Sequence, residues 1–330
     1  MSKYGSPSVA AFLVDGYSLL AAKVKGFTYK IETLTEPGHG LGDSWEAPVL
    51  TGIQRATFAQ EQAFFDDTTA SFHDAFKTGA GSSAQAAVRI VGVAPTGNTI
   101  GQLFLGLEGA YHQDYSVIAT NGQLTKANVT YAVSGKVDQG RILSAHASKS
   151  ASWNTKTDGA QLDMLTDPSL VAIPVTSSSV ANPTTITTAI AHGLTTGNTI
   201  VITGHTGSTA TPSLNNRGFA VTVTGTTTFT ITADVTVGGT GGQLVQVTSA
   251  NGGAGYQLVS ALSGITGFVG KIQGSPDDVT YTDLLSFSNI STAHVAERVT
   301  VAGAIPRFLS YVGTFTGSGS ISVLVGFARG

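Results

Sequence analysis

The stretch "VKGFTYKIETL", residues 24–34, decides the fold class of this chain. Three apolar side chains alternate along it with three polar ones: Phe27, Tyr29 and Ile31 against Thr28, Lys30 and Glu32. A period of two places one set on a buried face and the other on an exposed face of a β-strand. Strand-like runs recur through most of the chain, so we expect an all-β protein.

The composition agrees with a β-rich fold. Only 11% of the 330 residues are charged, against about 25% in an average globular protein. Thr, Ser, Gly and Asn take their place, and these residues suit strands and turns better than helix surfaces. The net charge of −3 argues against a nucleic-acid-binding domain, which usually carries a basic face. The chain has no cysteine, which excludes disulfides, thiolate catalysis and Cys-type zinc sites.

One helix is expected, at "DTTASFHDAFKTG", residues 67–79. Asp67 or Thr68 can cap its N-terminus, and Phe72 and Phe76 lie four residues apart on one face. Before it, "TEPGHGLGDSWEAP", residues 35–48, is expected to be a loop of 14 residues. Loops of this length are uncommon unless they are functional or disordered.

The composition changes between residues 174 and 248, where Arg217 and Asp234 are the only charged residues. Short strand-like runs at about ten-residue spacing indicate a small sandwich or barrel here. We therefore expect a β domain, a discontinuous second β-sandwich and an inserted module: residues 1–140, residues 141–172 with 250–330, and residues 173–249.

Two expectations concern strand number. "NTIGQLFLGLEG", residues 98–109, and "DYSVIAT", residues 114–120, are expected to be separate strands. Six strands joined by tight turns are expected after residue 250, starting near residues 255, 267, 278, 297, 307 and 320.

Two histidines suggest a metal site at first sight. His192 and His205 flank "NTIVIT", residues 198–203, which is an expected strand. No two of the seven histidines have the i, i+4 spacing of a zinc-binding helix, and no HExxH motif is present. We therefore interpret both histidines as turn residues.

Other candidates for chemistry have structural interpretations. Asp277, Asp278 and Asp283 could hold calcium, but the EF-hand pattern is absent and a hairpin turn is favoured. Trp153 is a candidate for stacking on a sugar, with core packing or an interface as the favoured role. No P-loop lysine follows the glycine clusters, and no G-x-S-x-G motif is present. We expect no enzyme activity, no cofactor and no bound metal.

Both ends of the chain resemble one family. "LGDSWEAPVLTGIQRATFAQEQAFFDD", residues 41–67, has a Leu-Gly-Asp start, a Thr-Gly turn, a strand, and an aromatic-Asp-Asp before the helix. "ERVTVAGAIPRFLSYVGTFTGSGSISVLVGFARG", residues 297–330, has an arginine-aromatic strand, a Gly/Ser turn and a closing Val-Gly-Phe-Ala-Arg strand. Both stretches resemble the major tail tube proteins of long-tailed bacteriophages.

The insert resembles a different unit. "AHGLTTGNTIVITGHTG", residues 191–207, and "LNNRGFAVTVTGTTTFTI", residues 214–231, are similar to the first catalytic-cysteine half-domain of ubiquitin-activating enzymes. Copies of this small β-module are widespread in phage tail proteins. No thioester can form here, because the chain has no cysteine.

The resemblance implies a tail-tube-type β-sandwich with one flanking helix, a second β-sandwich and a small barrel-like insert. It further implies a structural subunit of the virion tail whose rings stack around a channel, through which DNA passes without specific binding. Rings of six chains, or of three chains that each supply two tube-forming sheets, both fit. The expected partners are copies of the chain itself and the tail-tip and head-proximal terminator proteins, with no membrane.

The resemblance also implies an inter-ring contact loop, with Trp45 as its buried anchor: Gly38, His39, Gly40, Leu41, Gly42, Asp43, Ser44 and Trp45. Deleting residues 38–46 should prevent long tubes, and deleting residues 174–248 should leave assembly intact. The alternative function is a carbohydrate-binding or adhesion protein on the tail surface or at the tail tip. No signal peptide is visible, so synthesis in a cytoplasm is expected.

Overall fold

The structure is a computed structural model that describes residues 11–18, 26–37, 48–65, 76, 89–133, 137–163, 172–246, 252–275, 278–303 and 305–330. Within these residues the fold is all-β, as the sequence predicts. The expected helix at 67–79 lies outside the described residues except for Phe76, which is helical and fully buried. No helix in the described part of the chain is long and apolar enough to cross a membrane.

Four antiparallel strands form what we call the four-stranded sheet. Their spatial order is β6, β7, β4, β3, with bounds Leu103–Ile118, Lys126–Val133, Pro48–Phe64 and Gly26–Pro37. The prediction of two strands near residues 98–120 is wrong, because β6 continues through a register shift between His112 and Asp114. The other side of β6 pairs with β5 (Arg89–Ala94), and β1 (Ala11–Val14) pairs with β5 and with β2 (Tyr17–Ser18).

One face of the four-stranded sheet packs into a hydrophobic core. Phe58 and Tyr131 are buried at its centre. The Phe12 ring lies 5.4 Å from Phe58, and the Phe76 ring lies 6.1 Å from Tyr131, both measured between centroids. Burying one such ring stabilises the fold by about 1.5–3 kcal/mol. This core therefore determines which face of the sheet is turned outward.

The second part of the fold is built on β19 (Gly253–Ser275) and β22 (Phe308–Arg329), which pair antiparallel almost end to end. The sequence predicts two strands in place of each, and this prediction is wrong. Gly264 and Gly317 have φ angles of +70° and +97°, which glycine adopts readily. Register shifts at these positions let both strands bend together and continue.

Five further strands complete this part: β8 (Val137–Lys149), β9 (Trp153–Asn154), β10 (Leu162–Asp163), β20 (Thr282–Ser286) and β21 (Val295–Val301). The first three pair with β22 and the last two with β19.

Strand β8 belongs to both parts. Val137–Arg141 pairs with β6, and Arg141–Lys149 pairs with β22. A division of the chain between residues 140 and 141 therefore falls within one strand. A further core spans the junction, since Phe104 and Leu13 from the first part are buried with Tyr256 and Leu324 from the second.

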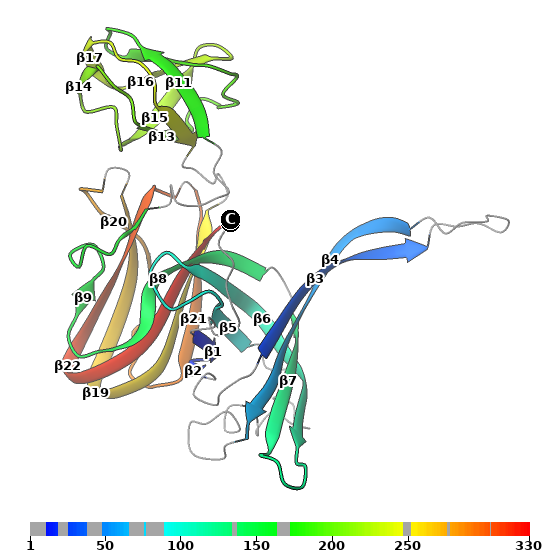
Figure 1. Cartoon of the computed structure of the whole chain (residues 1–330). Coiled ribbons are helices and arrows are strands. Elements are labelled where there is room, and N and C mark those ends of the chain that lie inside the picture. Colours follow the sequence, from blue (N-terminus) through cyan, green and yellow to red (C-terminus); the bar gives the residue numbers. More distant parts are fainter. Residues whose placement is uncertain are drawn as a thin grey trace, which may run out of the picture.

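Six strands between residues 172 and 246 close into a barrel, which stands apart from the other strands in Figure 1. In order around the barrel they are β11 (Ala172–Ser178), β12 (Thr184–Thr188), β16 (Thr228–Ile231), β15 (Gly218–Val223), β13 (Thr199–Thr203) and β18 (Gln243–Gln246). β14 (Thr209–Thr211) and β17 (Asp234–Val237) form a separate pair. Alternate apolar side chains fill the interior, with Ile186, Ile200 and Phe229 fully buried.

Candidate functional site

Strand β3 forms an open edge of the four-stranded sheet. Among the strands that the structure describes, β3 pairs with β4 only, from Gly26 opposite Glu61 to Pro37 opposite Pro48. The backbone along such an edge is a template for pairing with another chain. The β3 edge is therefore a candidate surface for assembly.

The far end of the β3–β4 hairpin projects beyond the sheet. We call this segment the arm: Glu32–Pro37 of β3 and Pro48–Arg55 of β4. The described pairing of β7 with β4 begins only at Ala56, so the arm is two strands wide. Figure 1 shows it extending away from the other strands. A two-stranded hairpin is at best marginally stable alone in water, so contact with a partner would stabilise the arm.

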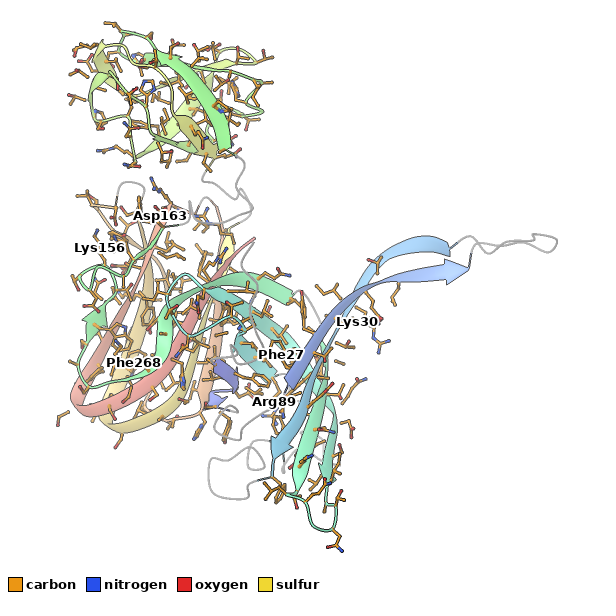
Figure 2. All side chains as sticks on the ribbon, viewed as in Figure 1. Phe27, Lys30, Arg89, Lys156, Asp163 and Phe268 are labelled. Atoms are coloured by element: carbon orange, nitrogen blue, oxygen red, sulfur yellow. The ribbon has the colours of Figure 1, made fainter. Side chains whose placement is uncertain are left out.

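The surroundings of the apolar face of β3 differ from one end of the strand to the other. Phe27 stacks on Phe58 with ring centroids 5.6 Å apart, and Tyr29 packs against the same core, which confirms the predicted inner face there. Ile31 lies on this face but is 43% exposed. Figure 2 shows the reason, since β3 runs from Phe27 near the core outward past Lys30. The prediction of a buried position is wrong for Ile31.

The opposite face of the sheet is polar, and we call it the polar face. Thr28, Ala59, Thr130 and Asp114 form one row across its four strands. By strand alternation, the described charged residues on this face and at the base of the arm are three bases and three acids: Lys30, Arg55, Lys126, Glu32, Glu61 and Asp114. Lys30 pairs with Glu32 and lowers the pKa of Glu32. The charges on this face balance.

A charged network ties the sheet to the second part of the fold. The Tyr256 hydroxyl donates to Asp138 Oδ2 over 2.6 Å, and Arg298 Nη2 lies 2.9 Å from the same oxygen. Arg298 Nη1 lies 2.7 Å from Glu108 Oε2. Burial, followed by the hydrogen bond and charge of Asp138, raises the pKa of Tyr256. Gly106 makes room for the Tyr256 ring, because a Cβ there would lie 2.5 Å from it.

The loop predicted to contact the next ring lies outside the described residues. None of its members, Gly38 to Trp45, is placed by the structure. Its two flanking segments are described, and the expected loop at 35–48 is shorter than predicted, because β3 continues to Pro37 and β4 begins at Pro48. The arm thus carries the predicted loop at its end.

Both barrel histidines use their ring nitrogens in hydrogen bonds. His192 Nδ1 accepts from the Leu194 N–H over 3.0 Å, and its Nε2 donates to the Gly225 carbonyl over 3.0 Å. His205 Nδ1 donates to the Gly241 carbonyl over 2.7 Å, and its Nε2 lies 2.9 Å from Ser178 Oγ. Both side chains are buried. These bonds hold loops of the barrel in place, as a turn role predicts.

Asp278 and Asp283 are also engaged within the protein, whereas Asp277 lies outside the described residues. Asp278 accepts from Lys156 and Gln161, and Asp283 accepts from Lys271 and Gln273. β19 and β20 are antiparallel neighbours, which confirms the predicted hairpin. No group of three or more His, Cys, Asp or Glu in the described ranges could hold a metal ion.

Trp153 is a core residue. Its ring is 8% exposed and stacks on Phe268 with centroids 5.7 Å apart. Tyr311 covers another side at 5.7 Å. Gly313 lies so close that a Cβ there would be 2.6 Å from the indole. The core role favoured for Trp153 is confirmed, and its ring offers no open face to a sugar.

No protein-family model matches the chain, and no curated protein matches it. Among solved structures, it is similar to a chain of the virion of a native gene transfer agent particle, at 9% identity, a TM-score of 0.26, and coverage of 35% of this chain and 83% of that chain. A chain from the tail of an empty gene transfer agent particle, refined with C6 symmetry, matches at 9% identity and a TM-score of 0.24, covering 39% and 80%.

The Dit protein of phage SPP1, described as a hub adsorption apparatus protein in phages that infect Gram-positive bacteria, matches at 10% identity and a TM-score of 0.24. That match covers 96% of this chain and 98% of the Dit chain. At these TM-scores none of the three likenesses carries an argument about function.

Proposed function

We propose that this chain is a structural subunit of a bacteriophage tail tube, whose copies form stacked rings around a channel for DNA. The four-stranded sheet is the observation that carries the proposal. It has a core face covered by its own chain, an outward polar face and an open edge at β3. Pairing of this edge with a different surface of the next copy would remove it from solvent and continue the assembly around a ring.

The charge of the polar face supports its placement on the channel. Proteins bind the phosphates of the DNA backbone through Lys and Arg side chains, so a surface that binds DNA carries more basic than acidic residues. The polar face has three bases and three acids at its described positions, and small residues such as Thr28, Ala59 and Thr130 between them. A wall of this kind lets DNA pass without specific binding.

The protein is a component of the virion tail. Its main partner is a further copy of itself, in rings of six chains or of three chains that each supply two sheets. Tail-tip and head-proximal terminator proteins bind the two ends of the tube. The second part of the fold and the barrel lie on the outside of the tube, and the loop at the end of the arm contacts the next ring.

Electron microscopy of the purified full-length protein over a range of concentrations tests the proposal, with particle masses from mass photometry. We expect rings with a central channel that stack into tubes as the concentration rises. Single rings that never stack would indicate a tail-tip component. A chain that stays monomeric at every concentration would overturn the proposal.

A matched pair of variants tests the role of the open edge. The double substitution Thr28→Glu with Lys30→Glu adds negative charge beside Glu32 on β3, and we expect it to weaken ring formation. Thr222→Glu with Arg217→Glu, at exposed positions of the barrel region, makes the same change in charge; it is the control and should leave rings unchanged. Equal ring formation by both proteins would show that β3 does not lie in the interface between copies.

A further inference from the structure

The sequence contains the pair Asn-Gly twice, at Asn121 with Gly122 and at Asn251 with Gly252. We propose that Asn121 is a site of spontaneous deamidation, and that the fold selects it over Asn251. In this modification the side-chain amide becomes a carboxylate without the help of an enzyme. The inference concerns the folded chain alone, so it stands apart from the proposed function.

The chemistry favours a glycine after the asparagine. The backbone nitrogen of Gly122 loses its proton to water or hydroxide and attacks Cγ of Asn121. The C–N bond of the side-chain amide then breaks, and its nitrogen takes up a proton and leaves as ammonia. The product is a five-membered succinimide, which a water molecule opens to aspartate or isoaspartate. Glycine permits the close approach because it has no Cβ beside the attacking nitrogen.

The first pair lies at the exposed centre of the turn between β6 and β7. The Gln123 N–H donates to the Thr120 carbonyl over 3.0 Å, and Gly122 has a φ angle of +76°. These features fit a type II turn with Asn and Gly at its two central positions. The turn does not use the Gly122 N–H, which makes no hydrogen bond to the described residues. The reacting nitrogen is therefore available to lose its proton to solvent.

This turn also has room for the succinimide ring. A Cβ built on Gly122 would meet no heavy atom within 4 Å. Asn121, Gly122 and Gln123 are all exposed, so water and hydroxide reach the reacting atoms. Ring closure therefore requires adjustment of the turn alone and leaves the strands on either side paired.

The glycine of the second pair has the opposite surroundings. Gly252 is buried, and a Cβ there would overlap the Val301 carbonyl oxygen and lie 3.0 Å from Ala302 Cα. Its own carbonyl accepts from the Gly330 N–H over 2.9 Å. The backbone on which a second ring would form is thus packed and hydrogen-bonded. Two pairs with the same local sequence are therefore expected to differ in reactivity because of their tertiary contacts.

Deamidation would change the charge of the β6–β7 turn. No residue from Tyr115 to Thr125 is charged, so the new carboxylate would be the first charge in this stretch. The isoaspartate product also adds a methylene group to the backbone between the strands. Protein that has aged would therefore differ from newly made protein in both the charge and the length of this turn.

Peptide mapping by mass spectrometry tests the proposal on the full-length protein during incubation at mildly alkaline pH. We expect Asn121 to convert progressively to aspartate and isoaspartate. The conversion should be on the order of tenfold faster than at Asn251, because reaction there requires local opening of the packed Gly252 backbone. Equal conversion of the two residues in the folded protein would overturn the selection by the fold.

Unfolded protein is the control for local sequence. In guanidinium chloride the two residues should convert at similar rates. Asn121→Gln should abolish the modification in its peptide, because the longer side chain would have to close a six-membered ring, whereas Asn251→Gln should leave conversion of Asn121 unchanged. An Asn121 that stays intact in the folded protein while the unfolded chain reacts would overturn the proposal.

Discussion

The barrel and the four-stranded sheet are both antiparallel, but the barrel has no edge strand and the sheet has one. The barrel strands β11, β12, β16, β15, β13 and β18 close on themselves, so this ring of six strands has no free side. The sheet ends at β3, which pairs on one side only among the described strands. Both regions expose single apolar side chains, such as Val180 in the barrel and Ile31 in the sheet. Edge closure therefore separates a unit with no free strand from one whose described edge is open to pairing.

The largest expected effect is on stacking, through the end of the arm. Replacing residues 38–47 by Gly-Asn-Gly-Ser keeps the ladder from Gly26 to Pro37 and supplies a turn that hairpins accept. We expect single rings in place of stacks, with an unchanged circular dichroism spectrum. The same measurements on a chain without residues 174–248 should show normal stacks. Stacks of normal length from the arm variant would show that the open sheet needs no contact at its arm.

Substitutions that remove a buried ring test the difference between the barrel and the four-stranded sheet. Phe229→Ala in the barrel and Phe58→Ala in the sheet each remove a buried ring, and each should lower the free energy of unfolding of its own region by about 3–5 kcal/mol. Only Phe58→Ala should also abolish ring formation, because the proposed interface between copies lies on the sheet. Calorimetry paired with electron microscopy measures both. Loss of rings in Phe229→Ala would show that the barrel takes part in assembly.

A smaller effect is expected at the joint between the sheet and the second part of the fold. Arg298→Met leaves the Asp138 carboxylate buried with the Tyr256 hydroxyl but without its cation. Removing one partner of a buried pair destabilises by about 3 kcal/mol or more. Glu108→Gln is the control, since the Glu108 side chain is 61% exposed and such pairs contribute about 1 kcal/mol at most. Urea unfolding of both variants measures the difference, and equal midpoints would contradict it.

The smallest effect is a pH dependence at His146 of β8. Burial lowers the pKa of His146, whose Nε2 lies 2.7 Å from Ser260 Oγ. The unfolded chain gains a proton on this residue near pH 6.5, before the folded chain does. Its contribution to stability is therefore complete above about pH 6.5 and declines as the pH falls. We expect the melting temperature to fall on acidification and His146→Gln to weaken that slope. An identical slope in the variant would assign the effect to other groups.

Local sequence patterns predicted the parts of the fold that depend on neighbours in the chain. The alternation of Phe27 and Tyr29 identified the inner face of β3, and the turn role of His192 followed from its flanking strand. The same alternation failed at Ile31, because burial there depends on how far the core extends beneath the strand. Alternation with a period of two shows which side chains share a face of the strand. It does not show what covers that face.

Long-range pairing was the part that the sequence could not supply. Gly264 and Gly317 were interpreted as turn residues between strands, whereas each bends a strand that continues beyond it. The joint of Gly106 and Tyr256 depends on two strands that are distant in sequence and meet only in the folded chain. The arm is not predicted for a similar reason, since residues 35–37 and 48, in the outer part of its two strands, are expected to be loop. A glycine can form a turn, bend a continuous strand or make room for a ring. The residues that pack against it in the folded chain decide which of these it does.

The first and last strands of the barrel lie side by side, with Ala172 opposite Val245. A folded unit whose two ends lie close together can be inserted into another domain, because the insertion requires only two neighbouring points in the chain of that domain. Genetic recombination at this position can exchange the whole unit for another with adjacent ends in one step. For an engineer, the same position is a place to insert a reporter or a binding domain into this protein.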